Sequence, residues 1–169
     1  PTRFLIHDSI YDTVVEKLVE KAEAIKCGDP LAEGVDQGPQ CNKVQFDKIM
    51  EYIEIGKTEA KLVAGGYADT EGDNAKGYYI RPTIFSDVPA DARIAQEEIF
   101  GPVLSCIRFH STEEAVQIAN STEYGLAAGL YTADVSRAHK VAEQLDAGML
   151  FINRYGCYGL AAPFGGFKQ

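Results

Sequence analysis

The sequence has no long apolar run and few basic residues. No stretch approaches the ~20 apolar residues that a spanning helix needs, and no basic segment leads into an apolar one at the N-terminus. Lys and Arg number 16 against 25 Asp and Glu, which gives a net charge of −9. An acidic surface does not attract nucleic acid or anionic lipid, so we expect neither nucleic acid nor a membrane as a partner.

Cysteine and histidine are also sparse, with four and three residues. No CxxC pair occurs and no histidine lies at ligand spacing, so we expect no metal site and no disulfide framework. Scattered reduced thiols are typical of cytoplasmic proteins, and we expect that location. The isolated histidines are expected to have surface or capping roles. These residues are Cys27, Cys41, Cys106, Cys157, His7, His110 and His139.

Length and composition are those of an ordinary globular chain. The 169 residues are 46% hydrophobic and 24% charged, which is enough to form one domain over residues 1–169 with a real core. The sequence begins at Pro1 rather than at Met. We therefore expect a processed, excised or partial piece of a longer product.

The first half of the chain shows helical periodicity between short apolar strands. Arg3–His7 reads as a buried strand, and a helix is predicted after it because Tyr11, Val15, Leu18, Ala22 and Ile25 form one apolar stripe. Ser9 followed by Asp12 resembles a capping box at the start of that helix. A second helix is predicted over residues 42–58, with a strand over residues 60–66 after it.

The second half alternates more regularly. The strand predicted over residues 78–85 contains Pro82, which favours a sheet edge or a bulge, and a short helix is predicted over residues 90–99. Later strands are predicted at residues 103–109, 126–131 and 149–153, with helices between them, the first capped by Ser111 and Glu114. This alternation predicts an α/β fold: a three-layer α/β/α arrangement with an open, mostly parallel sheet.

One stretch, Gln96–Val103, combines two carboxylates, an aromatic residue and a Gly-Pro break. A carboxylate such as Glu98 can accept hydrogen bonds from the vicinal hydroxyls of a ribose. Phe100, two residues further on, can supply a flat apolar wall beside a flat ring. The alternative is a helix end, with glutamates on the solvated face, Phe in the core and Gly-Pro as a stop signal.

The flanking sequence favours the first interpretation. Gln96–Val103 resembles the Gln-Glu-Glu-Ile-Phe-Gly-Pro signature of the NAD(P)-dependent aldehyde dehydrogenase superfamily. Six other blocks resemble the family in order and spacing: Thr2–Asp8, Gly38–Gln45, Tyr78–Pro82, Asn120–Gly129, Gly148–Asn153 and Pro163–Lys168. A reductase of the glutamate-semialdehyde type shares the fold, but the signature and the Pro-Phe-Gly-Gly-Phe-Lys ending favour the oxidising branch.

The resemblance implies a mechanism and shows what this chain lacks. In the family a cysteine thiolate attacks an aldehyde to give a thiohemiacetal, hydride passes to the nicotinamide, and water releases the carboxylic acid. The resemblance places the nucleophilic cysteine three residues before Pro1, so no catalytic residue is expected in this chain, and none of its four cysteines is a substitute. The Rossmann-type cofactor domain is likewise expected to be missing.

The resemblance also assigns binding roles residue by residue. Glu98 would hold the nicotinamide-side ribose and Phe100 would flank the nicotinamide, while Gln45 and Lys48 would reach the adenosine ribose of NAD or NADP. Tyr158 and Phe164 would line the aldehyde entrance, and Asn153 would be a structural hydrogen-bonding residue. The alternatives are a solvated helix flank for Gln45 and Lys48, and packing against a missing neighbour for the two aromatics.

Two hypotheses follow for the chain as a whole. It is the C-terminal part of the catalytic domain of an aldehyde dehydrogenase, inactive alone and with no cofactor bound to it alone, whose partner is the missing N-terminal cofactor-binding half. The alternative is a stand-alone, non-catalytic remnant that acts as a self-associating or interaction module. In both cases exposed apolar faces favour a homo-oligomer.

Overall fold

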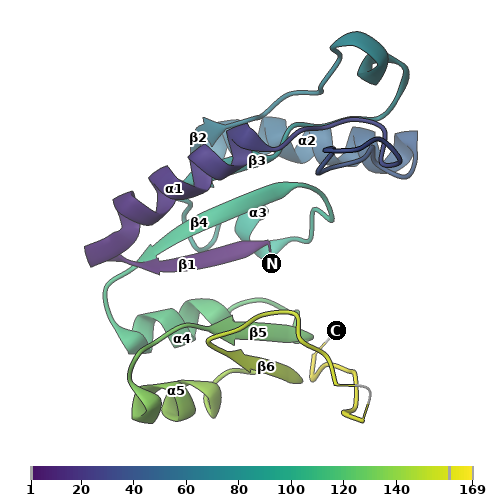
Figure 1. Cartoon of the computed structure of the whole chain (residues 1–169). Helices are drawn as coiled ribbons and strands as arrows, with labels where there is room; N and C mark the ends of the chain where they lie inside the picture. Colours follow the sequence, from purple (N-terminus) through teal and green to yellow (C-terminus); the bar gives the residue numbers. More distant parts are fainter. Residues whose placement is uncertain (1, 160, 169) are drawn as a thin grey trace. The chain divides into compact units, whose positions relative to one another are not determined.

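The computed structural model describes residues 2–159 and 161–168, which form two compact units divided along the chain between Phe109 and His110 (Figure 1). The first unit contains β1 (Arg3–His7), η1 (Asp8–Ile10), α1 (Tyr11–Ala24), α2 (Lys43–Glu59), β2 (Lys61–Ala64), η2 (Gly72–Lys76), β3 (Thr83–Ser86), α3 (Arg93–Gln96) and β4 (Val103–Phe109). The second contains α4 (Thr112–Asn120), β5 (Ala127–Leu130), α5 (Val135–Ala142) and β6 (Met149–Ile152).

The α/β class with mostly parallel strands is confirmed. The first unit has one sheet in the order β1-β4-β3-β2, in which β4 runs parallel to both β1 and β3, and only β2 is antiparallel. The second unit has a separate parallel pair, β5-β6, with α5 between them along the chain. Among the described residues the strands therefore form two sheets rather than one.

The first unit has helices on both faces of its sheet. Ile84 belongs to the core cluster that α1 forms with Ile6 and Cys106. The next residue, Phe85, points to the opposite face, because successive strand residues alternate. There its ring lies so close to α2 that a Cβ on Gly56 would meet it at 2.6 Å. The central strand β3 is thus covered by α1 on one side and α2 on the other.

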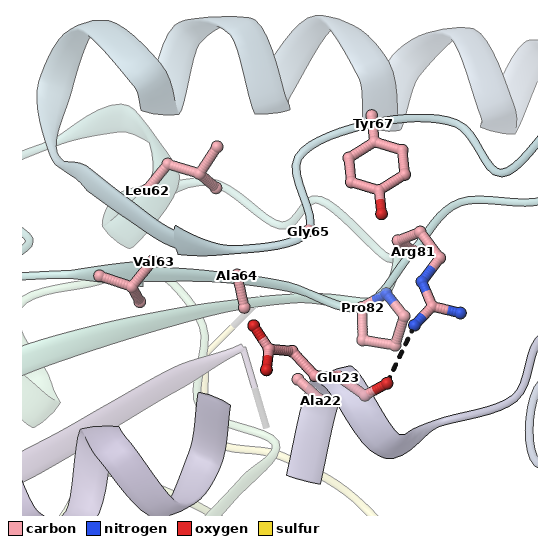
Figure 2. A pocket seen from close by; sticks show the side chains of 9 residues that line it. All are labelled: Ala22, Glu23, Leu62, Val63, Ala64, Gly65, Tyr67, Arg81 and Pro82. Carbon is pink, nitrogen blue, oxygen red and sulfur yellow. Dashed lines mark hydrogen bonds between the residues drawn. The ribbon is translucent and has the colours of Figure 1, made fainter. Parts of the chain in front are cut away.

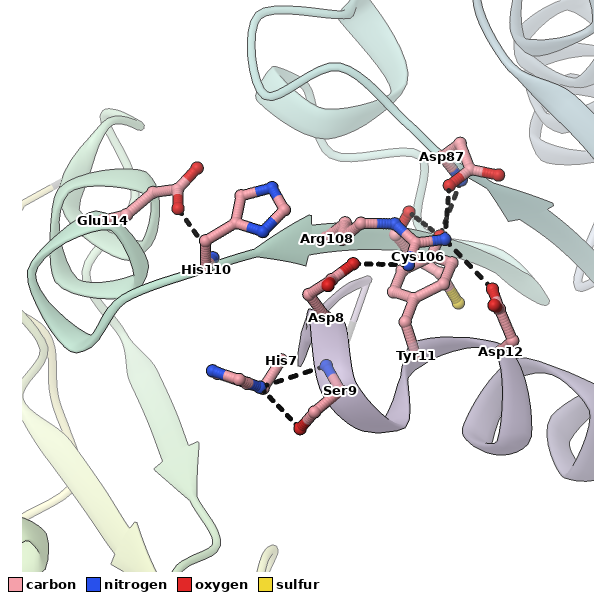
Figure 3. A network of polar contacts seen from close by, with 10 residues as sticks. All are labelled: His7, Asp8, Ser9, Tyr11, Asp12, Asp87, Cys106, Arg108, His110 and Glu114. Carbon is pink, nitrogen blue, oxygen red and sulfur yellow. Dashed lines mark hydrogen bonds and ion pairs between the residues drawn. The ribbon is translucent and has the colours of Figure 1, made fainter.

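A charge cluster fixes α1 to the sheet (Figure 3). The guanidinium of Arg108, on β4, lies over the Tyr11 ring at 3.8 Å and pairs with Asp8, Asp12 and Asp87 at 2.8, 3.0 and 3.2 Å. The buried Tyr11 hydroxyl accepts from the Asp87 amide and donates to the Cys106 carbonyl. Burial raises the pKa of Tyr11 to about 12. The cluster therefore serves the fold.

Three local expectations are wrong. Ser9 does not cap the long helix: the chain first makes the turn η1, which the His7 ring caps, and α1 begins at Tyr11 without a side-chain cap. Pro82 does not mark a sheet edge, because β3 pairs on both sides and begins only at Thr83. The alternative, a bulge, has a counterpart in the register shift of the β2–β3 pairing, which lies on β2 between Leu62 and Ala64. The helix expected over residues 90–99 shortens to Arg93–Gln96, because the chain is extended at Glu97.

The other helix starts and strand bounds agree closely with expectation. β4 spans Val103–Phe109 as predicted, and Asn42 caps α2 by accepting from the Gln45 amide. Ser111 caps α4 by accepting from the Glu114 amide, although Glu114 bonds back to His110 rather than to Ser111 (Figure 3). Within the described residues, no helix has the length and apolarity that crossing a membrane requires.

Candidate functional site

The two glutamates of the Gln96–Val103 stretch have different environments. Glu97 accepts two hydrogen bonds from the Arg93 guanidinium, at 2.9 and 3.0 Å, and a third from the Tyr52 hydroxyl at 2.5 Å. The hydrogen bonds from Arg93 and then from Tyr52 lower the pKa of Glu97 to about 2. Glu97 is thus an ionised carboxylate already engaged by the protein.

Glu98 is exposed, and its carboxylate bonds to no other residue that the structure describes. Its backbone is fixed instead, because Lys48 Nζ donates to the Glu98 carbonyl at 2.8 Å. An ionised carboxylate with open lone pairs can accept from two neighbouring hydroxyls. Of the two adjacent glutamates, Glu98 is the one free to bind a ligand.

Phe100 has an unusual backbone conformation. Its φ is 58°, in the left-handed region that bulky residues rarely adopt, and its side chain is 70% exposed. Such a conformation costs roughly 1–2 kcal/mol and persists only where the surroundings impose it. Gln45 Nε2 contributes to this by donating to the carbonyls of Phe100 at 2.7 Å and of Ile99 at 3.2 Å. The ring is thereby held out in solvent.

Close packing against α2 also fixes the segment that carries Glu98 and Phe100. Ile99 is 1% exposed, and α2 approaches so closely that a Cβ on Gly101 would lie 2.6 Å from the Ile49 side chain. Ile49 is itself fully buried. A Cβ at position 101 would therefore force the buried Ile49 side chain to shift.

The structure brings the four sequence-predicted cofactor residues together. Gln45 and Lys48 lie on α2 and contact the backbone of the segment that carries Glu98 and Phe100. Both polar ends are engaged by backbone carbonyls. The position of a ribose relative to them stays a prediction.

The two sequence-predicted substrate residues also meet, in the second unit. The rings of Tyr158 and Phe164 lie 5.7 Å apart, and Tyr158 also packs edge-on against Phe151 at 5.6 Å. Tyr155 also contacts Phe151, at 5.2 Å. Tyr158 and Phe164 are 59% and 68% exposed. The tail thus presents a small wall of aromatic rings to solvent, and its role stays a prediction.

The end of the tail is anchored by backbone contacts. Lys168 Nζ donates to the carbonyls of Asn120 and Thr122, and the Phe167 amide donates to the Gly125 carbonyl. A Cβ on Gly148 would lie 2.0 Å from the Gly165 carbonyl oxygen. The absence of a side chain at Gly148 therefore lets the end of the tail lie against the β5-β6 strand pair.

Asn153 has a structural role, as the sequence suggested. It follows β6 with a left-handed φ of 54°. Its side chain accepts from the Thr132 amide at 2.8 Å and donates to the Thr132 carbonyl at 2.9 Å. Both ends of the amide are thus used to join the segments after β5 and β6.

Burial disfavours the thiolate form of two of the four thiols. Cys106 is fully buried, and burial raises its pKa to about 12. Burial also raises the pKa of Cys27. Cys41 and Cys157 are exposed, and all four are free thiols. No group of three His, Cys, Asp or Glu side chains that could hold a metal occurs in residues 2–159 and 161–168.

A pocket of about 330 Å³ lies elsewhere in the first unit, between the end of α1, β2 and Arg81 (Figure 2). Its one cationic group is already engaged, because Arg81 donates to the Glu23 carbonyl and approaches Asp69 at 3.8 Å. None of the sequence-predicted site residues lines it. Its lining residues are Ala22, Glu23, Leu62, Val63, Ala64, Gly65, Tyr67, Arg81 and Pro82.

Sequence reasoning missed Tyr52, Arg93 and Glu59. Glu59 accepts from the Arg93 and Ile94 amides and so caps α3. The available signals were spacings: Arg93 and Glu97 are one helical turn apart, and Tyr52 lies one turn after Lys48 on α2. The contact between the two helices could not be read from those spacings.

The fold and site together define an α/β protein that presents one free carboxylate and one exposed aromatic ring on a fixed turn. The sequence model described as the aldehyde dehydrogenase family matches residues 1–169. The chain therefore belongs to the aldehyde dehydrogenase family.

Individual relatives agree. The chain is 47% identical to a betaine aldehyde dehydrogenase of Brucella anthropi, covering 99% of this chain and 35% of the relative. It is 46% identical to human aldehyde dehydrogenase 1A1, covering 99% and 33%. Among solved structures it resembles a betaine aldehyde dehydrogenase from Staphylococcus aureus in complex with NAD+, with a TM-score of 0.96, 33% identity and coverage of 99% and 33%. The chain spans about a third of the length of these relatives.

Proposed function

We propose that this chain is the C-terminal part of the catalytic domain of an NAD(P)-dependent aldehyde dehydrogenase. The whole enzyme would oxidise an aldehyde to a carboxylic acid through a thiohemiacetal on a cysteine outside this chain. This chain would supply one side of the cofactor site and one wall of the substrate entrance. The nicotinamide cofactor, when bound, supplies the hydride acceptor.

The observation that carries the proposal is the pairing of a free carboxylate with an exposed ring on a fixed backbone. Glu98 is open while its neighbour Glu97 is fully engaged. Phe100 is held in a strained conformation that exposes its ring. These groups suit a ribose and a flat heterocycle: Glu98 would accept from the ribose hydroxyls, and Phe100 would exclude water from one side of the nicotinamide.

Gln45 and Lys48 would support that site from α2, and either could also reach the adenosine ribose. Tyr158 and Phe164 would line the aldehyde entrance. We propose a cytoplasmic location, supported by the four free thiols and by 48% identity to a relative named cytosolic aldehyde dehydrogenase 2 from Macroscelides proboscideus. NAD or NADP would require the missing N-terminal cofactor-binding half as well.

The chain alone is expected to be inactive and to bind NAD more weakly than ~1 mM. A charge-assisted hydrogen bond contributes about 1.5–3 kcal/mol, whereas association costs at least ~4 kcal/mol in lost freedom. A ribose clamp without a phosphate site therefore gives little affinity.

The proposal is tested by measuring NAD(H) affinity in the full-length protein that contains this chain. Glu98→Gln should raise the dissociation constant roughly 10- to 150-fold, which corresponds to one charge-assisted hydrogen bond. Glu51→Gln, an exposed glutamate on the same unit, is the matched control and should leave affinity unchanged. Unchanged affinity in Glu98→Gln would refute the role of Glu98.

A second function, self-association, is supported by a different observation. Large apolar side chains are exposed in the second unit, including Tyr131, Val135, Phe164 and Phe167 at 65–77%. The contacting rings of Tyr158 and Phe164 form an apolar patch, and such a patch favours burial against another copy. We propose a homo-oligomer, and a non-catalytic self-associating module is the alternative function of this chain alone. Sedimentation that shows a monomer independent of concentration would contradict both.

A further inference from the structure

One face of α2 holds the segment that carries Glu98 and Phe100. Gln45, Lys48 and Tyr52 are spaced by three and four residues, so they lie along one side of the helix. Gln45 bonds to the Ile99 and Phe100 carbonyls, and Lys48 bonds to the Glu98 carbonyl. Tyr52 is the third member, and neither the family match nor the cofactor proposal gives it a role.

Tyr52 contacts both groups that fix Glu98. Its hydroxyl donates to Glu97 Oε2 at 2.5 Å. Two cationic groups lie over its ring: the Arg93 guanidinium is 5.5 Å from the ring centroid, and Lys48 Nζ is 5.7 Å from it. Arg93 holds the Glu97 carboxylate, and Lys48 holds the Glu98 carbonyl. Tyr52 therefore connects the side-chain anchor before Glu98 to the backbone anchor at Glu98.

This connection has a consequence for the neighbouring carboxylate. Glu97 accepts two bonds from Arg93 and one from Tyr52, so it is not available to a ligand. The Tyr52 bond crosses from α2, whereas the Arg93 bonds come from the adjoining short helix α3 and move with it. Without the hydroxyl, Glu97 loses its side-chain hydrogen bond to α2. Arg93 stays in contact with α2 through Glu59 and the Tyr52 ring.

We propose that Tyr52 is a positioning residue for cofactor binding, acting through Glu97 and Lys48 on the carboxylate of Glu98. The inference rests on the proposed function, because it assumes that Glu98 binds the cofactor ribose. In this proposal Tyr52 acts without contacting cofactor or substrate itself. Its effect is to keep Glu97 engaged and the backbone at Glu98 fixed before the cofactor arrives.

A double-mutant cycle in the full-length protein tests this. Tyr52→Phe keeps the ring and removes the hydroxyl, so it should raise the dissociation constant for NADH about fivefold, the effect of one net hydrogen bond. The same change in a Glu98→Gln background should have no further effect, because the group through which Tyr52 acts is gone. kcat at saturating cofactor should stay unchanged, while KM for the cofactor rises.

The other outcomes separate the positioning role of Tyr52 from the cofactor-binding role of Glu98. Equal weakening by Tyr52→Phe in both backgrounds, or none in either, would overturn the positioning role while leaving Glu98 as the clamp. If Glu98→Gln alone had no effect, the proposed function would fail, and this inference with it. Glu97→Gln is the second variant and should show the same dependence on Glu98, so the result does not depend on how well Tyr52→Phe folds.

A matched control tests whether the loss of any polar contact on α2 is enough to weaken NADH binding. Asp47→Asn removes the exposed pair with Lys43 on the same helix, away from the segment. It should leave NADH affinity unchanged in both backgrounds. Weakening by Asp47→Asn as large as that by Tyr52→Phe would assign the effect to general destabilisation of α2 and overturn the inference.

Discussion

The turn that carries Glu98 and the tail that carries Tyr158 present their candidate side chains in different ways. Around Glu98 the backbone is fixed residue by residue: Glu97 by its side chain, Glu98 and Phe100 by their carbonyls. Around Tyr158 the polar anchors lie at the far end of the tail, at Phe167 and Lys168. The contacts of Tyr158 itself are with the aromatic rings of Phe151 and Phe164.

The difference matches the chemistry proposed for each region. A carboxylate that receives two hydroxyls must be placed within a few tenths of an ångström, because hydrogen bonds weaken steeply with distance and angle. An apolar wall works through non-directional contacts and tolerates small shifts. We infer that the proposed cofactor contact needs a fixed segment, while the proposed wall of the aldehyde entrance does not.

The largest expected effect concerns the glycines that anchor the tail. Gly148→Ala would place a Cβ 2.0 Å from the Gly165 carbonyl oxygen, a backbone atom that cannot rotate away. Overpacking of this kind costs roughly 1–3 kcal/mol. We expect a lower unfolding midpoint and a raised KM for aldehyde, measured in the full-length protein by thermal denaturation and steady-state kinetics.

Two further glycine variants test whether the tail and the turn that carries Glu98 have separate roles. Gly159→Ala is the control, because a methyl group added at this position would meet no described atom within 4 Å. In Gly101→Ala the three atoms nearest to the added Cβ all belong to the Ile49 side chain, the closest at 2.6 Å, and a side chain yields more readily than the backbone oxygen at Gly165. This variant should destabilise less than Gly148→Ala but weaken cofactor binding. If Gly148→Ala altered cofactor affinity and Gly101→Ala altered aldehyde KM, the division of roles between the two regions would be wrong.

Sequence patterns predicted the regular parts of this chain well. The apolar run of Val103–Phe109 has one strand's length and no competing turn signal, and the structure keeps both bounds. Short-range polar signals were less certain. His7 replaced Ser9 as the cap because its ring nitrogen accepts from the Ser9 amide, an alternative that residue spacing does not distinguish.

The candidate site was only partly predictable for a related reason. The signature stretch named Glu98 and Phe100, and the resemblance added Gln45 and Lys48. The hydrogen bond from Tyr52 to Glu97 was not predictable from the sequence. The two residues are 45 positions apart, and only the packing of α2 against α3 brings them together. Nor does the left-handed backbone of Phe100 follow from a residue type that normally avoids it.

An intermediate effect is expected at Phe100, where the fixed turn stores strain. Phe100→Gly removes the penalty of a left-handed φ, roughly 1–2 kcal/mol, against an entropic cost of about 0.5–1 kcal/mol for glycine. We expect a net gain of at most about 1.5 kcal/mol in stability together with weaker NADH binding. A variant that lost stability would indicate that the ring is needed for packing, despite its 70% exposure.

The smallest effect is a pH dependence at Glu97. Its pKa is about 2 in the folded chain, below the ordinary value of 4.5, because Arg93 and then Tyr52 bond to the ionised form. A depressed pKa stabilises the folded state above the unfolded value, and that contribution is lost as the pH falls towards 2. Because Arg93 and Glu97 are 52% and 40% exposed, it should stay below about 1 kcal/mol.

Glu97→Gln therefore should lower the unfolding midpoint slightly at neutral pH, and the difference from the parent protein should shrink below about pH 5 and be largely lost near pH 2. Arg93→Gln removes the partner instead and should show the same convergence. Thermal denaturation across this range, at constant ionic strength, measures both. A difference that persisted undiminished at pH 2 would mean that Glu97 stabilises the turn by packing rather than by its charge. Electrostatics would then no longer distinguish the turn that carries Glu98 from the aromatic tail that carries Tyr158.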